Sequence, residues 1–110
     1  MIDWDRVAGL RDDVGEEDFD EVVELFLEEV DEVITRLREA PDLSTLEGDL
    51  HFLKGSAMGL GFRAFSAQCQ TGETLCAEGR AGELDLQALL ATYSDSRRVF
   101  LEEMPTALAG

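Results

Sequence analysis

The sequence predicts an all-α protein, an antiparallel up-down four-helix bundle with a short extra N-terminal helix. Apolar residues recur at the three- and four-residue spacing of a core-facing helical stripe along most of the 110 residues. Glycines and prolines interrupt that spacing at a few short turns. Four long helices joined by short connections pack most simply as antiparallel neighbours. We therefore expect one domain that covers residues 1–110.

Charge and apolar spacing predict the first two helices. Asp3 is a candidate cap for a short helix, which Gly15 should end. Acidic residues at 16–18 then begin a long helix, where the helix dipole favours negative charge, and its apolar stripe runs to about residue 39. The two stripes consist of Trp4, Val7, Leu10 and Val14, and of Phe19, Val22, Val23, Phe26, Val30, Val33, Ile34 and Leu37. The opposite face of the long helix should be solvated, and it carries Asp20, Glu21, Glu24, Glu28 and Asp31.

A third helix should follow the turn that Pro41 marks. Ser44 and Glu47 form a candidate capping box, S-x-x-E, at its start, and Gly61 should end it as a C-cap. Its apolar stripe consists of Leu46, Leu50, Leu53, Ala57 and Leu60.

Two more helices complete the predicted bundle. The fourth carries Phe62, Phe65, Cys69, Gly72 and Cys76 at bundle spacing, and a glycine in that stripe indicates a close helix contact. The two cysteines are seven residues apart on one helix, which excludes a disulfide between them. Gly79 and Gly82 mark a turn, and the last helix should end or fray at Pro105. The stripe of that helix consists of Leu86, Leu89, Leu90, Tyr93, Phe100, Leu101 and Met104.

His51 is the only histidine, and it should face solvent. At about 100° per residue it points roughly 140° away from the stripe of its helix. Gly48, Gly55 and Gly59 fall on the same outward face, although an interior glycine costs a helix roughly 1 kcal/mol relative to alanine. We infer that this face is cleared for a large partner. Lys54, one turn away, supplies a cation for phosphate oxygens.

These residues resemble a known signature. The run from His51 to Ala57, followed by Leu60 and Gly61, is similar to the H-x-L-K-G-S-x-x-x-L-G motif of histidine-containing phosphotransfer (HPt) domains of two-component phosphorelays. The likeness covers roughly residues 5–104, but outside the motif it rests on helix pattern.

The resemblance implies a phosphocarrier rather than an enzyme. His51 would accept a phosphoryl group from a phospho-aspartate of one receiver domain and pass it to an aspartate of another. Lys54 would stabilise the phosphoryl group, and Glu73 would hydrogen-bond the imidazole. A sensor histidine kinase and response-regulator receiver domains would be the partners, and Mg²⁺ would come from the receiver, with no intrinsic cofactor. The expected partner-docking residues are Gly48, Phe52, Gly55, Met58 and Gly59.

Composition excludes several other partners. With 25 acidic residues against 9 basic ones, the net charge of −16 disfavours nucleic acid and anionic membranes, which are bound by basic patches. No apolar run reaches the length of a membrane span, and the first residues do not resemble a signal peptide. We expect a cytoplasmic protein, and a monomer because no second apolar stripe is evident. Neither a CxxC pair nor a histidine cluster offers a metal site.

Three alternatives stay open at the level of sequence. An enzyme could use His51 as a general base, although no nucleophile elbow or phosphate-binding glycine loop accompanies it. A protein-binding scaffold would use the same cleared face without phosphorylation. The chain could also be the histidine domain of a larger chemotaxis-type or hybrid kinase, although its methionine start and compact ends favour a free-standing carrier.

Overall fold

The computed structural model describes residues 2–107, and in this part of the chain it contains helices and no β-strand. The prediction of an all-α fold is confirmed. The helices are α1 (Trp4–Val14), α2 (Glu16–Glu39), α3 (Leu43–Gly59), α4 (Arg63–Ala77) and α5 (Leu86–Ala107), with a 3₁₀ turn, η1 (Ala81–Glu83), before the last.

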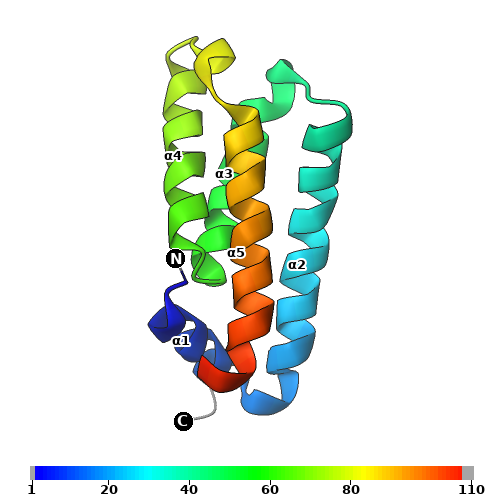
Figure 1. The fold of residues 1–110 in the computed structure, drawn as a ribbon, viewed down its shortest axis with the longest axis vertical. Coiled ribbons are helices and arrows are strands. Elements are labelled where there is room, and N and C mark those ends of the chain that lie inside the picture. Colours follow the sequence, from blue (N-terminus) through cyan, green and yellow to red (C-terminus); the bar gives the residue numbers. More distant parts are fainter. Residues whose placement is uncertain (1, 108–110) are drawn as a thin grey trace.

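The four long helices lie side by side along the length of the molecule (Figure 1). In this view α2 runs upward, α3 downward, α4 upward and α5 downward, while α1 crosses the lower end. The molecule is elongated, with principal extents of 45 × 21 × 20 Å. One continuous core runs between the helices, and its largest fully buried side chains include Leu37, Leu50, Leu53, Phe62, Phe65, Leu89 and Phe100.

A glycine turn joins α3 to α4 and fixes the start of α1 against them. Gly61 adopts a φ of +74°, and the amides of Gly61 and Phe62 donate to the carbonyls of Met58 and Ala57. This pair of hydrogen bonds is the Schellman ending of a helix, so the predicted role of Gly61 is confirmed. The carbonyl of Gly61 also accepts from the amide of Asp3 at 2.7 Å, and Asp3 caps α1 as expected. The turn therefore holds α1 at the base of α3 and α4.

Gly72 sets how closely α4 approaches α3. A Cβ atom at Gly72 would lie 2.8 Å from Cδ1 of Leu50, which is too short for an ordinary contact. The close helix contact predicted from this glycine is present. The nearby Cys69 and Cys76 are both free, with Cys69 buried and Cys76 half-buried.

The start of α3 corrects the predicted capping box. The N-cap is Asp42, whose carboxylate accepts from the backbone amide of Ser44 at 2.9 Å and from its hydroxyl at 2.7 Å. Ser44 thus lies inside the helix, and Glu47 is an exposed residue one turn further on. Asp caps a helix as well as Ser does, and Asp42 directly follows the Pro41 turn, so the helix begins earlier than the box indicated.

Pro105 lies within the last helix, α5, which the structure describes as far as Ala107, two residues beyond the proline. One residue of the predicted apolar stripe of this helix is wrong. Leu101 is exposed at 41%, outside the core in which the stripe placed it.

The polar face of α2 differs from the prediction at Asp31. Its carboxylate accepts a hydrogen bond from the Tyr93 hydroxyl at 2.6 Å and pairs with the Arg97 guanidinium at 3.1 Å. Asp31 therefore links α2 to α5 and is only half exposed. The apolar stripe of the same helix also contains Leu27, which is buried and which the predicted set lacked.

Within residues 2–107, no helix is both long enough and apolar enough to cross a lipid bilayer.

Candidate functional site

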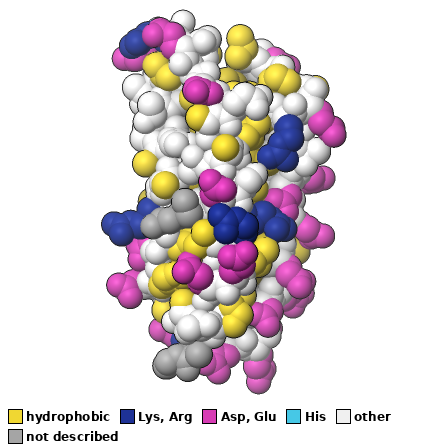
Figure 2. Space-filling model, viewed as in Figure 1, with side chains coloured by type: hydrophobic (Ala, Val, Ile, Leu, Met, Phe, Trp, Pro, Cys, Tyr) yellow, Lys and Arg dark blue, Asp and Glu magenta, His cyan; other side chains and the backbone are white. Residues whose placement is uncertain are grey.

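His51 stands on the outer face of α3. Its side chain is 73% exposed, whereas the flanking Leu50 and Leu53 are fully buried. The helical period places the two leucines toward the core and the imidazole toward solvent, as predicted. On the face shown in Figure 2 no histidine is visible, so the ring lies on another side of the molecule.

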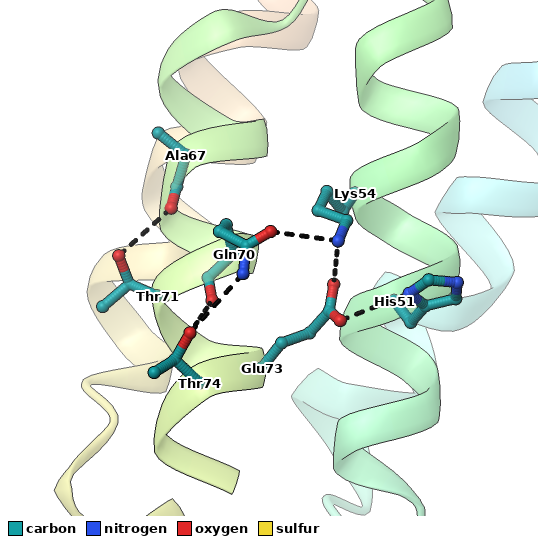
Figure 3. A network of polar contacts seen from close by, with 7 residues as sticks. All are labelled: His51, Lys54, Ala67, Gln70, Thr71, Glu73 and Thr74. Atoms are coloured by element: carbon teal, nitrogen blue, oxygen red, sulfur yellow. Dashed lines mark hydrogen bonds and ion pairs between the residues drawn. The ribbon is translucent and has the colours of Figure 1, made fainter. Parts of the chain in front are cut away.

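Glu73 on α4 contacts one nitrogen of the ring. Its Oε2 lies 3.2 Å from Nδ1 of His51, and Figure 3 shows the carboxylate between the ring and Lys54. With a carboxylate at Nδ1, the neutral imidazole carries its proton there and donates it to Glu73. The lone pair is then on Nε2, the other nitrogen of the exposed ring. Within the described residues, Nε2 has no such carboxylate contact.

Lys54 holds the other oxygen of the same carboxylate. Its ammonium lies 3.0 Å from Oε1 of Glu73 and donates to Oε1 of Gln70, also at 3.0 Å (Figure 3). The Lys54 side chain is only 22% exposed. The one lysine of the site is thus anchored against α4 rather than extended into solvent.

Gln70 is a site residue that the sequence analysis missed. Its amide nitrogen donates to Oγ1 of Thr74 at 3.5 Å, which orients the amide so that its oxygen faces Lys54. The sequence nevertheless contains a pattern that could have identified Gln70, namely a three-residue spacing that occurs on both helices. His51 and Lys54 are three residues apart on α3, and Gln70 and Glu73 are three apart on α4, which runs the opposite way. The two pairs therefore face each other in register.

Opposing effects act on the Glu73 carboxylate. Desolvation raises its pKa, but the hydrogen bonds and charges of Lys54 and His51 lower it, and the net pKa lies below the ordinary value of 4.5. Glu73 is therefore ionised at neutral pH, and it can hold a proton donor at Nδ1 throughout the physiological range.

The packing of α3 on α4 explains why these side chains meet. Leu50 contacts the position of Gly72, and the residues next in sequence are His51 and Glu73. Because Gly72 has no side chain, α4 comes close enough for a glutamate to span the gap. A core contact therefore sets the geometry of the exposed pair.

The glycines near His51 divide into two kinds. A Cβ atom at Gly48 or Gly55 would meet nothing within 4 Å, so neither glycine is needed for packing in this chain. Gly59 corrects the prediction: it is half-buried, and a Cβ there would contact the Phe26 ring of α2 at 3.5 Å. The face around His51 is open at Gly48 and Gly55 and covered at Gly59.

Two apolar side chains on α3 are exposed beside this face, Phe52 at 38% and Met58 at 47%. Exposed large apolar residues next to a reactive group are typical of a surface that a partner covers. In the part of the chain that the structure describes, no group of three or more His, Cys, Asp or Glu side chains is arranged to hold a metal ion.

The site is thus an exposed imidazole, held by a carboxylate on a helical scaffold. The chain belongs to the Hpt domain family, whose pattern it matches over residues 21–109. Domains of this family take part in phosphotransfer in two-component signalling, with histidine kinases and response regulators as partners. The family predicted from the His51 motif is confirmed. No curated protein and no solved structure matches the chain.

Proposed function

We propose that this protein is a phosphocarrier that relays a phosphoryl group between receiver-domain aspartates through His51. The observation that carries the proposal is the state of the ring: His51 is exposed, and Glu73 occupies Nδ1. Nε2 is left as the nucleophile. The scaffold would be the antiparallel up-down four-helix bundle expected from the sequence, formed by one domain over residues 1–110.

The transfer step follows from that geometry. The Nε2 lone pair attacks phosphorus, an N–P bond forms, and the P–O bond to the donor aspartate breaks with its electrons leaving on the carboxylate. The imidazole gains positive charge as it attacks. The nearby Glu73 carboxylate stabilises that charge while the proton stays on Nδ1. The reverse step delivers the phosphoryl group to the next aspartate.

The receiver would contribute the rest of the chemistry. We propose that it brings the aspartate and the Mg²⁺ that stabilises the charge on the transferring group, so that this chain is not an enzyme in its own right. We also propose that the protein is cytoplasmic and monomeric.

Lys54 would act in two ways. In the unphosphorylated protein its ammonium neutralises Glu73 and, with Gln70, keeps that carboxylate in place. After transfer, its charge lies one helical turn from a dianionic phosphoryl group and favours it.

The partner would dock on the open face of α3. Gly48 and Gly55 leave room above the helix, and the exposed Phe52 and Met58 provide apolar contacts. Gly59 would contribute at the edge of this surface, since Phe26 already covers it.

The test is transfer of labelled phosphoryl groups from a panel of phosphorylated receiver domains to the wild-type chain and to His51→Gln. We expect label on the wild type only, stable in alkali and labile in acid. The double variant His51→Gln/Glu102→His, which places an exposed histidine on α5, should stay unlabelled because it has no carboxylate arrangement like that of Glu73. Label on His51→Gln, or no label on the wild type from any receiver, would refute the proposal.

A further inference from the structure

Two arginines differ from the other basic residues of this acidic protein. Arg6 and Arg63 are exposed, and neither side chain forms a hydrogen bond or ion pair within residues 2–107. Most of the other cations are neutralised by carboxylates, in the pairs Arg36–Asp49, Lys54–Glu73, Arg80–Glu83, Arg97–Asp31 and Arg98–Asp95. With a net charge of −16, unpaired positive charge is scarce on this molecule.

Both arginines line one groove. The groove has a volume of about 330 Å³ and lies where the start of α1 meets the turn between α3 and α4. Met58 and Ala67 provide exposed apolar surface in it, and the buried Phe62 lies beneath them. Among the described residues that line the groove, Asp3 is the only acidic one, and it is already engaged as the cap of α1.

The groove is continuous with the phosphotransfer site. Lys54 and Gln70 line it, and the same two side chains hold Glu73 beside His51. A protein that covers the imidazole from the side of Lys54 therefore also covers this groove.

We propose that the groove of Arg6 and Arg63 binds a segment of the receiver domain that carries a carboxylate side chain next to an apolar one. This inference rests on the proposed function of His51. The two guanidiniums complement a carboxylate, and the exposed surface of Met58 and Ala67 complements the apolar neighbour.

Charge explains why this contact would select a partner. Acidic side chains crowd the right-hand edge of the face in Figure 2, where α2 lies, and such a surface repels an acidic protein. The two guanidiniums of the groove would attract an acidic receiver segment, and the acidic side chains of α2 would repel it. The two arginines would therefore set the orientation in which a receiver reaches His51.

The experiment compares two double charge reversals that change the net charge equally. Arg6→Glu/Arg63→Glu reverses the groove, and Arg80→Glu/Arg98→Glu reverses two exposed arginines outside it. Transfer from a cognate phosphorylated receiver is measured over a range of receiver and salt concentrations. We expect the groove variant to raise KM on the order of tenfold at low salt, with a maximal rate close to that of the wild type. Its KM should also depend less on salt.

The control double variant should stay within about twofold of the wild-type KM, since a distant rim charge acts only through the screened net field. Direct phosphorylation of His51 by phosphoramidate should be equal in all three proteins, which shows that the site is intact. An unchanged KM in the groove variant, or equal increases in both double variants, would overturn the inference while leaving wild-type transfer, and so the proposed function, in place. Competitive inhibition by free glutamate would also overturn it, because the groove would then be a small-anion site.

Discussion

At the scale of single residues, Glu73 has the central position. One carboxylate oxygen contacts Nδ1 of His51 and the other contacts the Lys54 ammonium. The lysine keeps the carboxylate ionised, and the ionised carboxylate keeps the proton on Nδ1. In the proposed mechanism, the availability of Nε2 as a nucleophile thus depends on a residue that would not touch the phosphoryl group.

Replacing Glu73 separates its charge from its hydrogen bond. We expect Glu73→Ala to slow phosphotransfer severalfold and to shift the tautomer of His51, observed by ¹⁵N NMR of the ring. Glu73→Gln should keep much of the tautomer preference, because the amide oxygen still accepts from Nδ1, but should still slow transfer because the developing positive charge loses its partner. Equal rates in the wild type and both variants would contradict this positioning role.

The same residue predicts a pH dependence of stability. The folded-state pKa of Glu73 lies below 4.5, so its contribution is complete above that pH and is lost as the pH falls through the lower folded value. In urea unfolding, Glu73→Gln should be less stable than the wild type at pH 7 by about 0.5–1 kcal/mol, the size of a partly exposed ion pair. The difference should shrink below pH 4.5. Glu47→Gln, an exposed change on α3, should show neither effect.

At the scale of elements, two glycines near the site differ in whether the fold requires a glycine at that position. Gly61 has a φ of +74°, and a Cβ there would lie 2.6 Å from the backbone oxygen of Asp3. Gly55 is an exposed helical residue whose Cβ would meet nothing within 4 Å. One glycine is required by the fold, and the other is not.

Alanine at each position tests this contrast. Gly61→Ala should lower the free energy of unfolding by at least about 1–2 kcal/mol, because it combines a left-handed backbone with a clash against Asp3. Gly55→Ala should raise it by up to about 1 kcal/mol through helix propensity. Urea unfolding of the two variants beside the wild type measures both, and a destabilised Gly55→Ala would show that α3 itself requires this glycine.

The elements also show how far sequence patterns reach. Spacing predicted the long helices and the exposure of His51, because both depend on the period of a single helix. The family motif led to Glu73, which the structure places against the ring. Gln70 was missed because its role depends on the register between α3 and α4. Asp31 was assigned to a solvated face for the same reason: its partners Tyr93 and Arg97 lie on α5.

Helix ends were predicted less well where two signals competed. Asp42 and Ser44 are both good caps two residues apart, and only the backbone conformation after Pro41 decides between them. Pro105 is a stop signal for helices, yet α5 includes it and is described as far as Ala107.

At the scale of the whole molecule, charge opposes compactness. A net charge of −16 is held within a body 45 Å long and about 20 Å across. At 10 mM salt the Debye length is about 30 Å, so acidic groups on opposite sides repel one another, whereas at 0.15 M it is about 8 Å and the repulsion is local. The burial of the core, together with ion pairs between helices such as Asp31–Arg97, must outweigh this repulsion.

We therefore predict that sodium chloride stabilises the protein. The melting temperature should rise by several degrees between 10 mM and 0.3 M salt, since about 1 kcal/mol corresponds to roughly 4–8 °C for a domain of this size. Glu24→Gln/Glu28→Gln, which removes two exposed charges from α2, should raise the melting temperature at low salt and reduce its further rise. Thermal unfolding followed by circular dichroism gives both values. A melting temperature that falls with salt would mean that the surface ion pairs, such as Arg36–Asp49 and Arg80–Glu83, contribute more than the net repulsion costs.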